Sequence, residues 1–502
     1  MRYRQADWDE PLIFELPLRE RTGFAPLGEV EVQLVERVLR ELGELARESL
    51  ELPSLSELEV VRHFTRLSQQ SFGVDTGTTP LGSCTMKYNP RLAWKMLLSE
   101  ELAELHQSML ELESSQGVLE LLYELQTWFS ELTGLPVCSL HPPAGASGEL
   151  AGVLMIKAYQ RDKGRAHKDE ILIPDSAHGS NPASAAMGGF RVVRIPTGRD
   201  GLVDLEALRF SATERTAGMM LTNPNTLGLF EERVTEICDI VHGVGGLMYY
   251  DGANLNGIMG WARPADMGFD IAHLNVHKTF SAPHGSGGPG AGVLCCTEEL
   301  AEYLPGYVIA QVGGRYVLRR PSRSVGDMTS SLFNLPALIY AYIFILGHGL
   351  RGLREAAANS VASTNYFIKL IEGVDGIDLP MAPSKPRMHE VVLSAKKLAE
   401  ETGVTANDVA KFLLDQGLHA PITYFPLIIE EALMIEFTET EPLEIVELYA
   451  KAIKDAIKLA RENPAHLKNA PSSTSRRRLD LVRANHPLTL SPSYRVEKRG
   501  VR

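Results

Sequence analysis

Cysteine is scarce in this sequence, and its few cysteines lack the spacings that bind metals. The 502 residues include five, namely Cys84, Cys138, Cys238, Cys295 and Cys296. None forms a CxxC pair, and no group of His and Cys residues has the spacing of metal ligands. These absences argue against structural zinc and favour a reducing compartment, so we expect no bound metal and a cytoplasmic location.

A basic surface is missing as well. Asp and Glu number 63 against 50 Lys and Arg, which leaves a net charge of −13, whereas nucleic acid binding needs a positive surface. A short basic stretch begins at Arg476, and it is typical of a solvated tail or a packed C-terminal arm. We therefore expect no nucleic acid among the partners.

No segment has the length and composition expected of a membrane span. The most apolar run, residues 332–346, contains Asn334 and Pro336 and is shorter than the roughly 20 residues that cross a bilayer. The charged N-terminus lacks the apolar core of a signal peptide. We interpret the apolar run as a buried core helix and expect no membrane partner.

Residues 1–135 are typical of an N-terminal arm followed by helices. Leu and Val recur at helical spacing between Val32 and Leu50. The stretch from Glu100 to Leu132 is again helical, and Gly134 supplies a stop signal.

Residues 136–345 change to short apolar runs that alternate with helical stretches. Such runs indicate a mostly parallel sheet that helices cover on both faces. The predicted strands are Ile171–Ile173, Val192–Ile195, Met219–Leu221, Leu247–Tyr250, Ile271–Val276 and Ala291–Cys295. Ligands of α/β sheets bind beyond the carboxyl ends of the strands, and polar motifs follow four of these runs. We therefore predict an α/β fold with one site at that edge.

Residues 346–502 favour a smaller α+β domain and a tail. The segments His389–Leu393 and Leu433–Phe437 are typical of strands. The segments Thr405–Gln416 and Leu443–Arg461 are typical of helices, and Thr405 stands at the N-cap position of the first.

A lysine follows the run Ile271–Val276 and precedes a glycine-rich turn. Lys278 lies between His277 and Thr279. A lysine at a strand end, beside a loop that lets ligands approach closely, is a candidate to form a Schiff base with a carbonyl group. We expect Lys278 to bind an aldehyde cofactor, with His277 as a further contact. The alternative is an ordinary surface lysine.

An aspartate supplies the second requirement of a pyridoxal-phosphate (PLP) site. Asp251 follows the run Leu247–Tyr250, and a charged carboxylate at a buried strand end needs a partner. The protonated ring nitrogen of PLP is such a partner. Ala253, two residues on, would return to the same side and pack on the ring. The alternative is an aspartate that caps the turn with Gly252.

Two more strand ends carry polar residues that suit the same cofactor. His178 follows Ile171–Ile173, where its ring could stack on the opposite face of PLP. Thr222 follows Met219–Leu221 and is placed to contact the ring oxygen or the substrate. A structural histidine and an ordinary turn are the alternatives.

Two glycine-rich turns differ in what they predict. The first opens a helical stretch, and backbone N–H groups at a helix N-terminus bind phosphate, so Gly145, Ala146 and Ser147 are predicted to hold the phosphate of PLP unless they form an ordinary turn. The second, from Gly285 to Gly290, matches GxGxxG. It leads into a strand, and no acidic residue closes a strand about 20 residues on, so we reject a dinucleotide site.

Several strings of this sequence resemble one family, the P-protein of the glycine cleavage system (glycine decarboxylase). In chain order the strings are Pro80–Pro90, with its Leu-Gly-Ser-Cys-Thr-Met-Lys core, Ser176–Ala186, Thr222–Thr226, Leu274–Phe280 with the glycines after it, Tyr424–Pro426 and Glu431–Glu436. The chain is similar to the second, lysine-bearing subunit of the two-subunit form of that family.

This resemblance implies a fold-type-I PLP-dependent transferase architecture with a seven-stranded, mostly parallel sheet. It implies a glycine dehydrogenase (aminomethyl-transferring, decarboxylating), an oxidoreductase that removes CO2 from glycine and passes the aminomethyl group to the lipoyl arm of H-protein. Lys278 would hold PLP, Asp251 its ring nitrogen, and His178 would stack on the ring. The implied partners are lipoylated H-protein and a first subunit, in a heterotetramer of two each. The turn around Ser147 departs from the family pattern, which leaves the role of that side chain open.

Two other functions stay open from the residues. An amino-acid decarboxylase of the glutamate type also carries a His-Lys pair and would act without a lipoyl protein. A non-catalytic subunit would only shape an interface and would need neither Lys278 nor Asp251. The loop around Cys84 either lines the site or has a structural role.

Overall fold

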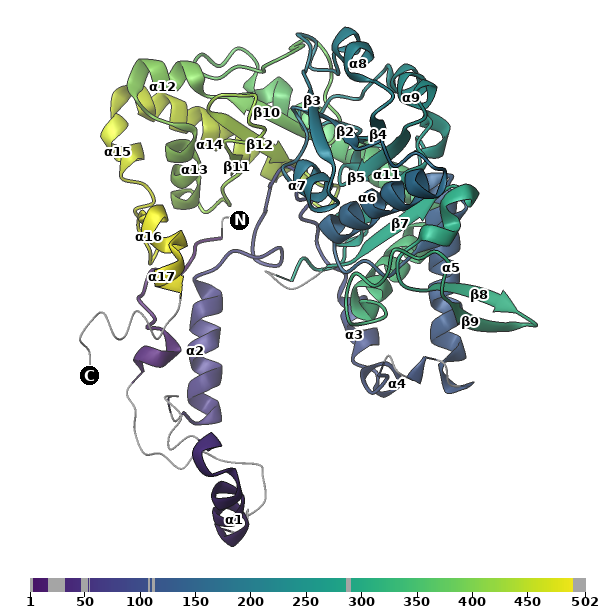
Figure 1. The fold of residues 1–502 in the computed structure, drawn as a ribbon. Coiled ribbons are helices and arrows are strands. Elements are labelled where there is room, and N and C mark those ends of the chain that lie inside the picture. Colours follow the sequence, from purple (N-terminus) through teal and green to yellow (C-terminus); the bar gives the residue numbers. More distant parts are fainter. Residues whose placement is uncertain are drawn as a thin grey trace. The chain divides into compact units, whose positions relative to one another are not determined.

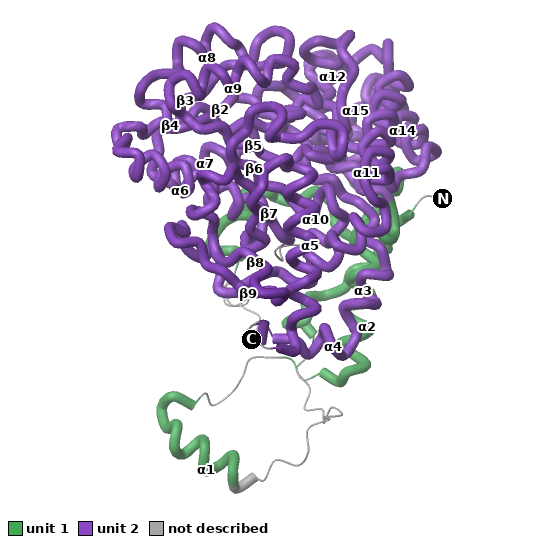
Figure 2. Tube along the Cα trace, turned by 90° about the vertical axis from the view of Figure 1, so that its right-hand side faces the viewer, with its two compact units in different colours: residues 1–77, 414–418, 469–502 green, residues 78–413, 419–468 purple. Residues whose placement is uncertain are grey.

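The computed structural model describes residues 3–16, 32–46, 53, 55–106, 109–110, 113–285 and 290–490. The chain divides into two compact units (Figure 2), which are residues 1–77, 414–418 and 469–502, and residues 78–413 and 419–468. Every predicted site residue lies in the second unit. The predicted division into residues 1–135, 136–345 and 346–502 stays a prediction.

Figure 1 labels most of the elements along the chain. The strands are β1 (Val137–Ser139), β2 (Glu170–Pro174), β3 (Arg191–Ile195), β4 (Thr216–Thr222), β5 (Leu247–Gly252), β6 (Ile271–Asn275), β7 (Gly292–Cys296), β8 (Val308–Val312), β9 (Arg315–Arg319), β10 (Glu390–Ser394), β11 (Ile422–Thr423) and β12 (Ala432–Glu436). The helices are α1 (Val32–Leu42), α2 (Glu57–Gln69), α3 (Arg91–Leu97), α4 (Glu100–Ala103), α5 (Gln116–Thr133), α6 (Gly145–Asp162), α7 (Ser180–Met187), α8 (Leu205–Ser211), α9 (Val234–Gly243), α10 (Val276–Thr279), α11 (Leu335–Ile371), α12 (Lys396–Thr402), α13 (Ala406–Asp415), α14 (Leu443–Glu462), α15 (Pro464–Lys468), α16 (Leu481–Asn485) and α17 (Pro487–Leu490).

Seven strands of the second unit form one sheet in the order β1-β7-β6-β5-β4-β2-β3. Strands β2 to β6 pair in parallel, and β7 pairs antiparallel with both β6 and β1. The predicted mostly parallel, seven-stranded sheet is thereby confirmed. Each predicted run lies within a strand, except that Val276 already begins α10 and Ala291 precedes β7. Strand β1 has three residues, too few to show a pattern in the sequence.

The two faces of this sheet are buried by different helices (Figure 1). Leu172, Met248 and Ala272 pack in one core with α5, α9 and α11, whereas their neighbours in sequence pack in another core with α6 and α7. Successive side chains of a strand point to opposite faces. A strand buried on both faces therefore reads as an uninterrupted apolar run, which is why these strands were visible in the sequence.

The prediction of one helix from Glu100 to Leu132 is wrong. Helix α4 ends at Ala103, and α5 begins only at Gln116. Before α5, the Ser115 hydroxyl donates to the Met109 carbonyl at 2.6 Å, and such a local bond competes with helical hydrogen bonding. The predicted stop is confirmed, because Gly134 caps α5 with a left-handed φ of 73°.

The remaining helical predictions are confirmed in part. Helix α1 begins at Val32 but ends at Leu42, and residues 47–50 of the predicted helix lie outside the described residues. Helices α13 and α14 match the predicted segments in the C-terminal region. Thr405 caps α13 as expected, because its hydroxyl accepts the Asp408 N–H and its own N–H donates to the Asp408 carboxylate.

The most apolar segment forms the first half of α11. Within the described residues, α11 is the one helix long and apolar enough to cross a membrane by length and composition. Its backbone leaves the helical region at Gly349 (φ 57°, ψ 177°), so it consists of two helical halves. In the first half, Leu338, Ala341 and Phe344 are buried in the core of the sheet, as expected of a core helix.

A second, three-stranded sheet follows α11, in the order β10-β12-β11. Strands β10 and β12 confirm the two strands predicted in the C-terminal region. They pair antiparallel, and their register sets Glu390 opposite Glu436.

In the first unit, the basic stretch near the C-terminus is packed in part as an arm. Arg476 pairs with Asp9 at 2.7 Å. Beside Asp9, the buried Glu10 lies 2.8 Å from His63 and 3.5 Å from Arg66. The basic residues from Arg495 onward lie outside the described residues.

A disulfide links Cys138 in β1 to Cys295 in β7, which the register of these strands places opposite each other. The two cysteines are 157 residues apart in sequence. The inference of a reducing compartment rested on the spacing of the cysteines along the chain, and this spacing does not reveal a pair that strand register creates.

Removing this bridge is expected to destabilise the second unit. A cross-link that closes a long loop restricts the unfolded chain, so Cys138→Ala with Cys295→Ala should lower the free energy of unfolding by about 2–5 kcal/mol. Chemical denaturation with and without a thiol reductant measures this. Cys238→Ala, which removes a buried free thiol, should keep the sensitivity to reductant. A wild-type denaturation midpoint that ignores the reductant would contradict the bridge.

Candidate functional site

Four of the predicted polar motifs meet at one edge of the large sheet. Strands β2, β4, β5 and β6 run in the same direction, so their carboxyl ends share that edge. His178 lies in the turn after β2, Thr222 ends β4, Asp251 lies at the end of β5, and Lys278 lies in α10 directly after β6. The site therefore combines segments that are distant in sequence.

Asp251 is a buried carboxylate with several donors around it. It accepts hydrogen bonds from the Ala253 N–H at 3.0 Å, the Asn181 side-chain amide at 2.9 Å and the Thr222 hydroxyl at 3.3 Å. Its other neighbour is His273, whose Nε2 lies 3.4 Å away. Burial raises the pKa of Asp251, but His273 and these donors outweigh burial and hold the pKa below its usual value. Asp251 is therefore ionised. The Thr222 hydroxyl and the Ala253 N–H both donate hydrogen bonds to it.

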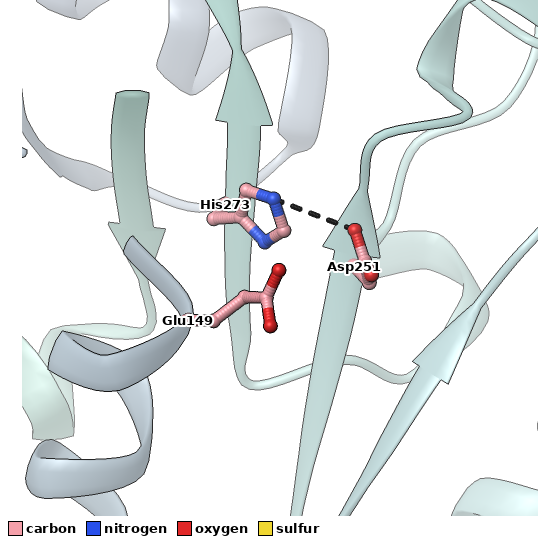
Figure 3. Close-up of side chains that lie close together, drawn as sticks. All are labelled: Glu149, Asp251 and His273. Carbon is pink, nitrogen blue, oxygen red and sulfur yellow. Dashed lines mark ion pairs between the residues drawn. The ribbon is translucent and has the colours of Figure 1, made fainter. Parts of the chain in front are cut away.

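A second carboxyl group, Glu149 in the first turns of α6, lies beside Asp251 (Figure 3). It is 4% exposed. The Ser180 hydroxyl lies 2.8 Å from its Oε1, and the Asn181 amide donates to its Oε2 at 3.0 Å. Burial and the neighbouring Asp251 raise the pKa of Glu149 to about 7. Sequence reasoning missed Glu149 because an acidic residue near a helix N-terminus is common for reasons of the helix dipole alone.

His273 completes the group drawn in Figure 3. It is fully buried in β6, its Nδ1 lies 2.7 Å from the Tyr249 hydroxyl, and burial lowers its pKa. Each of Glu149, Asp251 and His273 offers one carboxylate oxygen or ring nitrogen that could bind a metal ion, and these three atoms lie within 4.8 Å of one another. The same holds for a second group, formed by His389, Glu390 and Glu436. Neither group could be predicted from the spacing of its residues along the sequence.

Lys278 lies half-buried beside two histidines. The His277 ring meets the His284 ring edge to face at 4.9 Å, and its Nδ1 lies 3.2 Å from the Ala291 carbonyl oxygen. Burial lowers the pKa of His277 to about 3 and that of His284 to about 4, so both rings are neutral. The next turn approaches His277 closely, because a Cβ at Gly290 would lie 2.2 Å from its Nδ1. Residues 286–289 lie outside the described residues.

The predicted phosphate turn opens α6, as expected. The helix begins at Gly145, and its N-cap Ala144 offers no side-chain hydrogen bond. The first N–H groups of a helix have no partner within it, so an anion could bind at Gly145, Ala146 and Ser147. A Cβ at Gly145 would lie 2.3 Å from Oδ1 of Asn275. This close approach places the start of α6 against the segment that carries the lysine.

The loop around Cys84 closes on the site from outside the sheet. The Ser83 N–H donates to Glu390 at 2.7 Å, and the Thr85 N–H donates to Glu436 at 3.0 Å. Ser83 and Thr85 both have left-handed backbones, with φ of 62° and 43°, which non-glycine residues rarely adopt. Burial raises the pKa of Cys84, and the charge of Lys278 opposes this rise. The loop thus belongs to the site, held by two buried carboxyl groups.

These two carboxyl groups share their surroundings with the lysine. Burial raises the pKa of Glu436 to about 7, and burial together with Glu436 raises that of Glu390, while Lys278 opposes both shifts. The Asn254 amide donates to Glu390 at 2.8 Å. Neither glutamate was predicted, because a single Glu at the edge of an apolar strand is usually read as solvent-exposed.

Comparisons with known proteins agree with one another. The family model described as "Glycine cleavage system P-protein" matches residues 23–315, and "Glycine dehydrogenase, C-terminal domain" matches residues 356–475. A probable glycine dehydrogenase (decarboxylating) subunit 2 of Aeropyrum pernix is 53% identical over 99% of this chain and 98% of its own length. Its counterpart in Staphylothermus marinus is 51% identical over 98% of each chain.

Solved structures show the same architecture. A crystal structure of glycine decarboxylase (P-protein) of the glycine cleavage system, in inhibitor-bound form, matches with a TM-score of 0.72 at 23% identity and covers 87% of this chain and 100% of its own. Sphingosine-1-phosphate lyase of Burkholderia pseudomallei matches with a TM-score of 0.61 at 15% identity and covers 85% of this chain and 96% of its own. At these identities the likeness concerns the fold, which confirms the predicted α/β architecture.

Proposed function

This chain belongs to the glycine cleavage system P-protein family, and from this premise we propose that it is the second, lysine-bearing subunit of a glycine dehydrogenase (decarboxylating). The proposed reaction releases CO2 from glycine and transfers the remaining aminomethyl group to the lipoyl arm of H-protein. The observation that carries this proposal is the meeting of Lys278 and the ionised Asp251 at the carboxyl edge of the sheet.

The residues at this edge fit PLP. Lys278 offers an amine, Asp251 offers a negative charge for a ring nitrogen, and the start of α6 lacks a cap. Within the described residues, Asn275 Oδ1 and Thr279 Oγ1, on either side of Lys278, are buried without a hydrogen-bond partner. Buried polar atoms rarely stay unsatisfied, so these two suit a site that a polar molecule enters.

Each residue has a distinct task in the proposed reaction. PLP, when bound, supplies an electrophilic carbon and a ring that accepts the electron pair left by a departing group. Lys278 would hold that carbon, and its amine, once released by glycine, would give or take a proton. Asp251 would keep the ring nitrogen protonated. The exposed ring of His178 would cover one face of the cofactor, and the N–H groups of Gly145 to Ser147 would hold its phosphate.

The proposal extends to partners. The relatives are named subunit 2, which supports a first subunit, and we propose a heterotetramer of two each that acts on lipoylated H-protein. Helix α1 supports a partner chain as well, because its apolar side chains are 42–47% exposed, a surface that partners commonly bury; they are Leu34, Val35, Val38, Leu39 and Leu42. A cytoplasmic location stays a proposal.

Absorption spectroscopy followed by borohydride reduction tests the proposed cofactor. The purified chain, alone or with its first subunit, should gain a visible absorption band with PLP. Borohydride should then attach the reduced cofactor covalently to the peptide that carries Lys278. In a separate, unreduced sample that contains lipoylated H-protein as the acceptor of the aminomethyl group, glycine but not glutamate should release CO2. Release from glutamate alone would favour a glutamate-type decarboxylase. A mixture of both subunits that takes up no label at Lys278 would refute the PLP site.

A further inference from the structure

One hydroxyl group lies between Glu149 and His178 and can serve only one of them as donor. The Ser180 Oγ is 2.8 Å from Oε1 of Glu149 and 2.6 Å from Nδ1 of His178. A hydroxyl carries a single hydrogen, so one of these two neighbours must itself donate to Ser180. Either Glu149 is a carboxylic acid, or Nδ1 of His178 carries a hydrogen.

The backbone decides in favour of the first arrangement. The N–H of Ser180 points at Nδ1 of His178, 3.2 Å away. A backbone N–H can only donate, so Nδ1 acts as an acceptor. The Ser180 hydroxyl donates to Glu149 as long as Glu149 is a carboxylate. Once Glu149 carries a proton, the acid can donate to Ser180, and the hydroxyl donates to Nδ1 instead. In this arrangement the hydrogen of a neutral His178 ring lies on Nε2.

The surroundings of Glu149 favour the same arrangement. The side-chain amide of Asn181 donates to both Glu149 and Asp251, at 3.0 and 2.9 Å, so it holds two buried carboxyl groups close together. Two negative charges at this separation in a dry environment repel strongly, and one of the groups keeps its proton. Asp251 has His273 beside it and a lowered pKa, so the proton belongs to Glu149, whose pKa is raised.

Other titratable groups face Glu149 as well. Lys278 opposes the rise of its pKa, and the fully buried Tyr249 feels the charge of Glu149. The titratable groups around Glu149 are Tyr249 and Asp251 from β5, His273 from β6, Lys278 from α10 and His178 from the β2–α7 turn.

We propose that Glu149 is a positioning residue that keeps a proton and, through Ser180, holds His178 as the neutral ring with its hydrogen on Nε2. This inference rests on the proposed function, in which His178 covers one face of the cofactor ring. A cationic His178 would repel a protonated ring nitrogen held by Asp251, so a neutral imidazole is the form that the site requires.

The first test uses the protein without cofactor, so that it does not depend on catalysis. An unprotonated ring nitrogen of histidine reacts with diethyl pyrocarbonate as the nucleophile, and peptide mass spectrometry measures the product at His178. In the wild type, the rate at His178 should rise by roughly tenfold as the pH passes through about 7. Ionised Glu149 accepts from the Ser180 hydroxyl, so the hydrogen of the ring moves to Nδ1, which then donates to Ser180 and gives up its bond from the Ser180 N–H, and Nε2 is left free.

Glu149→Gln is the decisive variant. The amide N–H of glutamine donates to Ser180 as a carboxylic acid does, while its oxygen still accepts from Asn181. The rate at His178 should therefore stay low across the same pH range. The matched control is Glu231→Gln, which alters a buried glutamate that also has a raised pKa and binds the Val203 and Arg233 N–H groups; it should keep the wild-type rise. Ser180→Ala should also abolish the rise of the rate at His178, because it removes the hydroxyl that connects His178 with Glu149.

A rise at His178 in Glu149→Gln equal to that of the wild type would overturn the proposal. In the PLP-bound complex, Glu149→Gln should lose the pH dependence of kcat near neutrality, whereas a fall in kcat of more than about 100-fold would mean that Glu149 acts as a carboxylate and would also overturn the proposal. A wild-type complex that binds no PLP refutes the proposed function, and the cofactor-free rates still decide the inference about Glu149.

Discussion

Lys278→Ala is expected to abolish turnover of glycine while the fold survives. The substitution removes the amine that would hold the cofactor, and we expect kcat/KM to fall by at least roughly 10³-fold. Stability should change by less than about 1 kcal/mol, because Lys278 is half-buried and none of the hydrogen bonds or ion pairs found among the described residues involves its side chain. Steady-state kinetics and a thermal melt measure the two effects.

Two variants sharpen this prediction. Lys278→Arg keeps the positive charge but lacks a nucleophilic amine, so it should be as inactive as the alanine variant. Lys157→Ala removes an exposed lysine of α6 that donates to the Gly188 carbonyl, and it should keep wild-type turnover. Substantial activity in Lys278→Ala would sink the proposed mechanism.

Asp251→Asn is expected to cost the second largest share of activity. Asparagine has nearly the same size but no charge, so the ring nitrogen of PLP would lose the group that keeps it protonated. We expect kcat to fall by roughly 10²–10³-fold, with a visible absorption spectrum that shifts relative to the wild type. The change also turns one of the two oxygens into a donor, which then faces either the Asn181 amide or the Ala253 N–H, so the melting temperature should drop as well.

The control for Asp251 is its neighbour Thr222. Thr222→Val removes one hydrogen bond to Asp251, at 3.3 Å, but leaves the charge. It should lower kcat far less than Asp251→Asn, by about tenfold at most. If both variants kept wild-type kcat at full cofactor occupancy, the assigned role of Asp251 would be wrong.

Residues that follow strands could be placed from the sequence alone. Asp251 and Thr222 come directly after an apolar run, whereas Lys278 and His178 follow one two and five residues later. The runs are visible because the sheet is buried on both faces. Their meeting at one edge follows from the parallel order of the strands. The start of α6 at Gly145 was visible for a similar reason, as a glycine turn before a helical pattern.

The buried network around these residues could not be placed in this way. Glu149 has the sequence context of any acidic residue near the start of a helix, and His273 lies within an apolar run as a core residue would. Their importance arises from packing, because His273 meets Tyr249, 24 residues away, and Glu149 meets Asp251 only through the folded sheet. The Cys138–Cys295 disulfide could not be predicted for the same reason.

The hold of Glu390 and Glu436 on the Cys84 loop has a consequence for synthesis of the chain. The hydrogen bonds from Ser83 and Thr85 to these glutamates span 307 and 351 residues. At roughly 5–20 residues per second, the ribosome needs on the order of 15–70 s between the two ends of the longer contact. In the later part of that interval, once residue 278 has been made, the nascent chain carries Lys278 and the loop but not yet both carboxyl groups that hold the loop in place. Its catalytic centre can therefore close only as one of the last events of folding, after β12 has left the ribosome.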